Sequence, residues 1–97
     1  MNLAVATEPL FELGQTVATP GALRALAKAN LGAWTYLQRH LVGDWGDLDR
    51  EDAAANDEAV RQGLRILSAY TLPTQQRIWI ITEADRSVTT FLLPEDY

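Results

Sequence analysis

The stretch Arg65-Ile66-Leu67-Ser68-Ala69-Tyr70-Thr71-Leu72, followed by residues 77–82 and 87–93, decides the fold. Each of these runs is short, rich in β-branched and aromatic side chains, and bounded by turn residues, which is typical of strands. The connections, residues 73–76 and 83–86, are short enough to join antiparallel neighbours. The pattern predicts a three-stranded meander. The middle run is apolar on both faces, so we expect it to be central, with helices covering one side.

The segment before Gly63 has the features of a helix. Asp49 is a good N-cap, and Glu51 and Asp52 suit the positive end of the helix dipole. Gly63 is a typical C-terminal cap. Residues 43–48, with two glycines and two aspartates, are predicted to form the loop before this helix.

A longer helix is predicted further upstream. Thr19 is its N-cap, Pro20 occupies the first helical position, and the helix is expected to stop between residues 40 and 42. Gly32 weakens its middle, so a kink or a split into two pieces is an alternative. One apolar face follows from the helical spacing of Leu23, Leu26, Ala27, Asn30, Trp34, Leu37 and Leu41.

Helices followed by a meander define an α+β fold. We therefore expect two N-terminal helices packed on a C-terminal three-stranded antiparallel meander. Residues 10–17 alternate weakly, with a bulge or turn at Gly14, and an extra N-terminal edge strand there is the alternative. The 97 residues fit one domain, in which residues 1–9 are expected to be loosely ordered.

Composition excludes several classes of protein. The chain has no cysteine, which rules out a disulfide scaffold, a thiolate zinc site and a cysteine nucleophile. Its single histidine rules out metal motifs that need two, and no glycine-rich phosphate loop is present, so we expect no metal and no cofactor. No run approaches the roughly 20 apolar residues of a membrane helix, and no signal peptide is recognisable, so we expect a cytoplasmic protein.

The charge of the chain is segregated. The net charge is −5, and residues 44–58 contain seven acids and one base, which gives −6 there and +1 for the rest. An acidic surface repels phosphate backbones, so direct binding to duplex DNA is not expected. The acids are Asp44, Asp47, Asp49, Glu51, Asp52, Asp57 and Glu58.

Three interpretations of the acidic segment remain open. A calcium loop needs ligands at alternate positions, and Gly46 falls where a ligand should be, so the register fails. A solvated acidic helix start needs no partner. The third interpretation is a carboxylate array that mimics nucleic-acid phosphates and occupies a basic cleft on a protein partner, with Trp45 as an exposed aromatic anchor.

A catalytic alternative rests on three other residues. His40 or Glu83 would move protons and Arg86 would stabilise charge, in a metal-independent ribonuclease that resembles small barnase-like and RelE-like toxins. A sparse basic stripe of Arg24, Lys28 and Arg39 would face the RNA. Each residue also has a structural interpretation. His40 suits a helix C-terminus as a cation, and Arg86 suits an Asx-type turn with a local ion pair.

Self-association is a further alternative. The strand after Gly63, or the one ending at Leu93, would leave an open sheet edge through which a homodimer could form. The terminal residues 94–97 offer another exposed aromatic for a contact surface.

Several strings together resemble a family of small bacterial proteins that are frequent on plasmids and other mobile DNA. The strings are Ala18-Thr19-Pro20-Gly21-Ala22-Leu23, Arg39-His40, Gly43-Asp44-Trp45-Gly46-Asp47-Leu48, Ala54-Ala55-Asn56-Asp57, Leu67-Ser68-Ala69-Tyr70, residues 78–87 and residues 92–97. Leu64 departs from the pattern, in which a second glycine often follows Gly63. Members are often labelled hypothetical or as a type I restriction modification subunit. The second label does not fit, because a methyltransferase subunit needs a cofactor-binding α/β domain that this chain lacks.

The resemblance implies a fold family and an association with mobile DNA rather than an activity. Together with the acidic segment, it favours a non-catalytic interaction protein, an accessory or anti-defence regulator that binds a protein partner through residues 44–58. The ribonuclease is the alternative.

Overall fold

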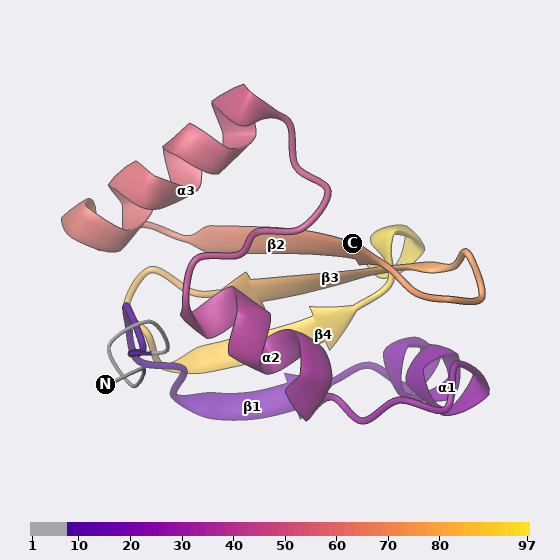
Figure 1. Cartoon of the computed structure of the whole chain (residues 1–97). Helices are drawn as coiled ribbons and strands as arrows, with labels where there is room; N and C mark the ends of the chain where they lie inside the picture. Colours follow the sequence, from indigo (N-terminus) through magenta and orange to yellow (C-terminus); the bar gives the residue numbers. More distant parts are fainter. Residues whose placement is uncertain (1–7) are drawn as a thin grey trace, which may run out of the picture.

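The computed structural model of the chain describes residues 8–97, and the expectation for residues 1–7 lies outside that range. Its elements are β1 (Gln15–Ala18), α1 (Pro20–Lys28), α2 (Trp34–Leu41), α3 (Arg50–Gln62), β2 (Ile66–Thr71), β3 (Arg77–Thr82), β4 (Val88–Leu92) and the 3-10 turn η2 (Pro94–Asp96). Figure 1 shows the strands as one sheet in the order β1-β4-β3-β2. The α+β class is confirmed, with three helices where two were predicted.

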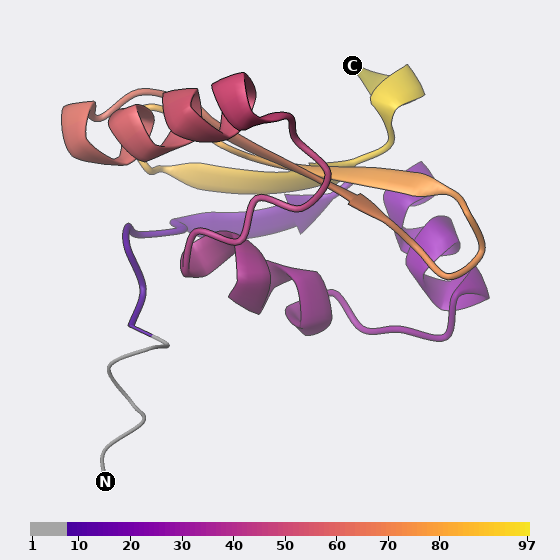
Figure 2. The ribbon, with the colours of Figure 1, turned by 45° about the horizontal axis from the view of Figure 1, so that its top comes forward.

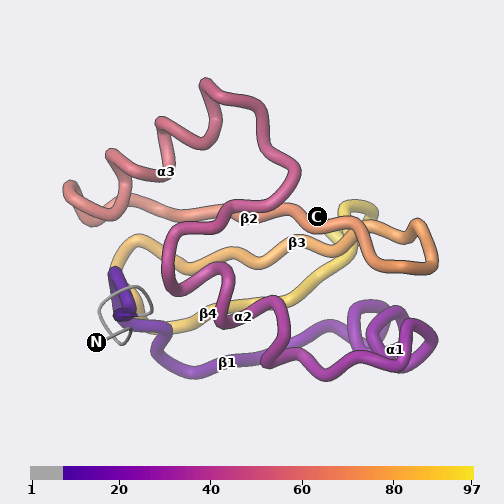
Figure 3. The backbone as a smooth tube through the Cα atoms, viewed as in Figure 1, coloured from indigo at the N-terminus to yellow at the C-terminus, as the bar shows by residue number. Residues whose placement is uncertain are grey.

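The predicted meander is present, and β3 occupies an inner position as expected. Antiparallel pairing sets Tyr70 opposite Ile78, and Ile80 opposite Phe91. The predicted edge strand also exists as β1, but it runs parallel to β4, so the sheet is mixed rather than purely antiparallel (Figure 3). Gln15 N donates to Ser87 O, and Thr19 N donates to Phe91 O. Side-chain alternation reveals a strand but carries no signal for its direction.

The long N-terminal helix is split, as the alternative at Gly32 allowed. Helix α1 ends at Lys28, and Asn30 then adopts a left-handed φ of 58°, which a continuing helix cannot contain. The Thr19 cap is confirmed, because Thr19 Oγ1 accepts from Ala22 N at 3.1 Å. The predicted apolar face is wrong at Leu23, Ala27, Asn30 and Trp34, which are all exposed. Within α1 the buried face consists instead of Ala22, Ala25 and Leu26. The break then resets the helical phase, so Trp34 no longer shares a face with Leu26.

Helix α3 forms with both predicted caps. Asp49 Oδ1 accepts from Asp52 N at 2.8 Å, and Gly63 ends the helix at a left-handed φ of 69°. The helix lies alongside β2 (Figure 1). The Asn56 side-chain amide bonds both main-chain groups of Leu67, donating to its O at 2.7 Å and accepting from its N at 3.2 Å.

One face of the sheet carries the main core. Helices α1 and α2 lie on this side (Figure 2), and residues such as Leu26 and Leu37 pack there against Tyr70, Ile80 and Phe91. Alternate strand residues share a face, so Ser68, Thr82 and Thr89 lie in the same buried layer. This polar group inside an apolar layer surrounds His40.

Among the described residues, no helix has the length and apolar character required to cross a membrane.

Candidate functional site

The loop before α3 is fastened to the outer edge of β2. Ala69 N donates to Trp45 O at 3.1 Å, and Asp47 N donates to Ala69 O at 2.7 Å. Gly46 makes this approach possible, because its φ is 79° and a Cβ there would lie 2.0 Å from Ala69 O. Tyr70 adds a bond from its hydroxyl to Asp44 O at 2.7 Å. The loop and α3 therefore form one continuous ridge along the β2 edge, which we call the acidic ridge (residues 44–58).

Most carboxylates of the acidic ridge are held by hydrogen bonds. Asp44 Oδ2 accepts from Arg39 Nε at 2.7 Å, and this ion pair holds the pKa of Asp44 below its ordinary value. Asp47 Oδ2 accepts from the Thr71 hydroxyl at 2.6 Å. Glu58 accepts from Arg61 and Gln62, which lowers the pKa of Glu58. These hydrogen bonds fix the orientation of the carboxylates.

Glu51 and Asp52 differ from these neighbours. Both are exposed in the first turn of α3, and neither side chain is hydrogen-bonded to another residue of the range 8–97. They are the acids of the ridge that can be altered with the least structural cost.

Trp45 is not the exposed anchor that its position between two glycines suggested. It is 5% exposed, it packs with Ala59 and Ile66, and its indole Nε1 donates to Asp57 Oδ1 at 3.0 Å. Because the main chain of the loop pairs with β2, the indole ring is turned into the core. Trp45 therefore orients the Asp57 carboxylate from within the core and cannot itself contact a partner.

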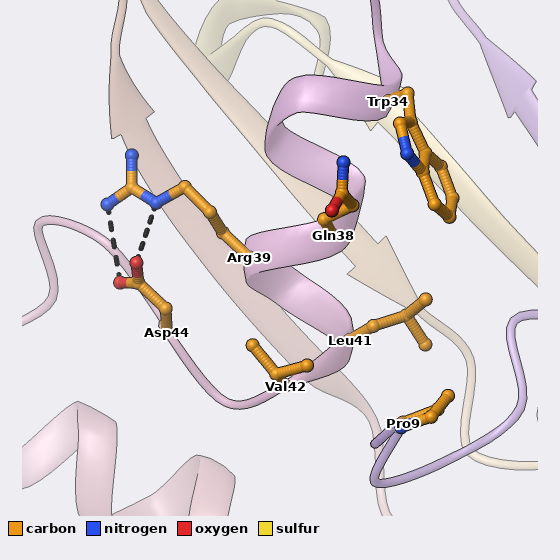
Figure 4. A pocket seen from close by; sticks show the side chains of 7 residues that line it. All are labelled: Pro9, Trp34, Gln38, Arg39, Leu41, Val42 and Asp44. Atoms are coloured by element: carbon orange, nitrogen blue, oxygen red, sulfur yellow. Dashed lines mark hydrogen bonds and ion pairs between the residues drawn. The ribbon is translucent and has the colours of Figure 1, made fainter. Parts of the chain in front are cut away.

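An exposed aromatic, Trp34, does share a hollow with the first acid of the ridge, Asp44. The hollow measures about 410 Å³, and Figure 4 shows the side chains that line it. It is lined by Pro9, Trp34, Gln38, Arg39, Leu41, Val42 and Asp44. Helical spacing predicted Trp34 in the core, but the helix break at Asn30 moves the indole out of the buried face.

His40 is completely buried at the centre of a chain of hydrogen bonds. Its Nδ1 lies 2.6 Å from Ser68 Oγ, its Nε2 lies 2.9 Å from Thr82 Oγ1, and Thr82 Oγ1 lies 2.8 Å from Thr89 Oγ1. Thr89 donates its hydroxyl to Leu13 O at 2.7 Å, so it must accept from Thr82. Thr82 then accepts from His40 Nε2–H, which leaves Nδ1 to accept from Ser68.

This environment keeps His40 neutral. Burial, and to a smaller degree the nearby Arg86 charge, lower its pKa to about 3. The expected cationic role at the helix C-terminus is therefore wrong. Both ring nitrogens are engaged inside the protein.

The Arg86 guanidinium donates hydrogen bonds to main-chain carbonyl groups near the end of α3. Its Nη2 donates to Ala59 O at 3.0 Å, and its Nη1 donates to Leu64 O at 2.7 Å and to Glu83 O at 3.1 Å. The expected Asx-type turn is confirmed one residue earlier, where Asp85 Oδ1 accepts from the Ser87 hydroxyl at 2.6 Å and from Ser87 N at 3.0 Å. These two bonds lower the pKa of Asp85. Arg86 bonds carbonyl groups in place of the expected ion pair.

The three residues of the ribonuclease alternative do not form an open site in this structure. The Phe11 ring lies against both His40 and Arg86, with its centroid 5.2 Å from the His40 ring and 5.6 Å from Arg86 Cζ. The basic stripe is also divided, because Arg39 pairs with Asp44 while Arg24 and Lys28 line a separate hollow of about 490 Å³ on α1.

Two further predictions concern metals and the C-terminus. In the range 8–97 no three or more Asp, Glu or His side chains converge in a way that could hold a metal ion, including those of the acidic ridge. Tyr97 is 65% exposed, as expected for a surface aromatic, and its ring packs edge-on against Trp79 at 5.7 Å.

The chain matches no protein-family model, no curated protein and no solved structure. The resemblance to mobile-element proteins therefore stays a prediction.

Proposed function

We propose that the chain is a non-catalytic interaction protein that binds a basic protein partner through the acidic ridge. The observation that carries the proposal is the fixed presentation of the carboxylates. Asp44, Asp47 and Asp57 each accept a bond from a different element or side chain, yet all three residues remain exposed. An array that is already ordered loses little conformational entropy when a partner binds.

The local charge supports this proposal. Residues 44–58 carry −6 with Arg50 counted, and the cations that flank this segment, Arg39 and Arg61, are each paired with an acid. A concentrated field of one sign attracts an oppositely charged surface and accelerates its approach. The complementary partner is therefore a protein with a cluster of lysines and arginines.

Trp34 supplies the apolar part of the same surface. Charge alone gives modest affinity, whereas interface energy is concentrated in buried aromatic anchors next to polar groups. The indole is 59% exposed and lines the same hollow as Asp44, across α2 from the Arg39–Asp44 pair (Figure 4). A partner that covers both features would bury the indole and meet the carboxylates together.

The biological role as an accessory or anti-defence regulator rests on the resemblance of the strings quoted above. A cytoplasmic setting is the matching expectation.

The test is affinity capture from a bacterial lysate at moderate salt, with the variant E51K/D52K beside the wild type. Neither acid makes a side-chain hydrogen bond within residues 8–97, so the variant loses only their interaction with the α3 dipole, and the melting temperature should fall modestly. The control E12K/E95K makes the same charge change at exposed acids outside the ridge. We expect one enriched protein that E51K/D52K loses and the control retains. Equal capture by all three would overturn the proposal.

We rank the ribonuclease second, because no observation in the structure favours it. Its imidazole and guanidinium are both engaged in internal hydrogen bonds, so catalysis would require those bonds to break. Cleavage of cellular RNA that disappears in Glu83→Gln, a variant at a partly exposed side chain, would reverse this ranking.

A further inference from the structure

The two edges of the sheet differ in whether their outward main-chain groups are hydrogen-bonded. At the β2 edge, the outward main-chain groups of Leu67 bond Asn56, and those of Ala69 bond the loop before α3. This edge is closed to further strands. The homodimer edges expected from the sequence are therefore wrong, because β2 is covered and β4 is internal.

The open edge is β1. Gln15 and Thr19 direct their N–H groups to β4, so the alternate residues Thr16 and Ala18 direct theirs outward. From residues 8–97, no main-chain hydrogen bond reaches the outward groups of Thr16 or Ala18. The strand Gln15-Thr16-Val17-Ala18 also contains no charge and no proline, which are the usual devices that protect an edge.

We propose that β1 pairs with β1 of a second copy of the chain, antiparallel and around a two-fold axis at Val17. In this register Thr16 exchanges both main-chain hydrogen bonds with Ala18 of the partner subunit, and the symmetric pair does the same. Val17 then faces its own symmetry mate in a non-hydrogen-bonded pair, where side chains lie closest. Val17 is 39% exposed in the single chain, so the contact gives it an apolar neighbour.

The charge distribution selects a second copy as the occupant. The acidic ridge lies at the β2 edge, across the full width of the sheet from β1. Residues 8–43 sum to only +1, so two copies that meet at β1 bring no strong like charge together. Pairing through the β2 edge would instead bring the two acidic ridges together.

The contact is small. Two four-residue strands bury well under the roughly 1,200 Å² of a standard interface, so we expect a weak dimer that forms at about 0.1 to 1 mM.

Sedimentation velocity from about 10 µM to 1 mM gives the first test, with the mass rising toward twice the monomer value. Val17→Lys should weaken association at least ten-fold, since it places two ammonium groups together at the axis. Leu64→Lys is the matched control, because Leu64 is also exposed and apolar but lies next to β2 at the other edge. A wild type that stays monomeric at 1 mM would overturn the proposal, and so would equal weakening by both variants.

The register has its own readout. The chain has no cysteine, so Val17→Cys introduces a single thiol. A non-hydrogen-bonded antiparallel pair has Cβ atoms about 4.5–5.5 Å apart, close to the separation that a disulfide spans. Mild oxidation should cross-link Val17→Cys much faster than Leu64→Cys. Equal rates for the two variants would show that Val17 does not lie on the axis and would overturn the proposal.

Discussion

His40 shows how a single buried residue can be held neutral by its neighbours. Each hydrogen bond in the chain from Ser68 to Leu13 has a defined donor, and the terminal carbonyl sets the direction of all of them. An imidazolium would carry a second N–H at Nδ1, where Ser68 now donates. Protonation therefore requires Ser68 to reorient and a charge to enter a buried site.

This arrangement predicts a pH dependence of folding. His40 has a pKa of about 3 when folded against 6.5 when unfolded, so the unfolded state binds the extra proton. Stability is complete above pH 6.5 and falls below it, by about 1.4 kcal/mol per pH unit and by about 2–3 kcal/mol at pH 4.5. Urea unfolding between pH 7 and 4.5 measures this loss before most carboxylates titrate.

An NMR titration of the His40 ring is the direct check. We expect an Nε2–H tautomer whose chemical shifts stay constant between pH 7 and 4.5. A ring that titrates near pH 6.5 would contradict the assignment.

At the scale of elements, the attachment of the loop to β2 depends on Gly46. Gly46→Ala should cost about 2–4 kcal/mol, because the positive φ is strained for alanine and the added Cβ meets the Ala69 carbonyl. Gly32→Ala is the matched control, since nothing lies within 4 Å of a Cβ there. It should change the unfolding free energy by no more than about 0.5 kcal/mol. Similar losses of unfolding free energy in both variants would mean that the attachment of the loop to β2 contributes little to stability.

Several elements followed from local pattern alone. The strands, the Thr19 and Asp49 caps and the Gly63 terminus are encoded by nearby residues, and all of them formed. The parallel pairing of β1, the burial of Trp45 and the closure of β2 by Asn56 depend on contacts between residues distant in sequence. No periodicity reports such contacts.

The candidate site was predictable to a similar degree. The charge of residues 44–58 can be read from the sequence. Which of these acids accept hydrogen bonds within the fold cannot. Asp57 proved to be bonded by Trp45, twelve residues earlier, while Glu51 and Asp52 remained the most open. Trp34 was missed because its placement depends on where the helix breaks.

At the scale of the whole molecule, the acidic ridge and the proposed β1 contact occupy opposite edges of one sheet. We therefore expect the proposed functions to be independent. Val17→Lys should capture the same protein as the wild type, and E51K/D52K should dimerise with an unchanged dissociation constant. Capture assays and sedimentation on both variants test this. Loss of both properties in either variant would indicate a shared surface or a damaged fold.

The closed β2 edge also limits how far assembly can go. A sheet grows without end only if each subunit offers two free edges, one to accept a neighbour and one to extend the row. Here Asn56 and the loop before α3 occupy one of them. Association through β1 consumes the other edge in both copies at once, so growth terminates at two subunits and the route to filaments by edge stacking is blocked.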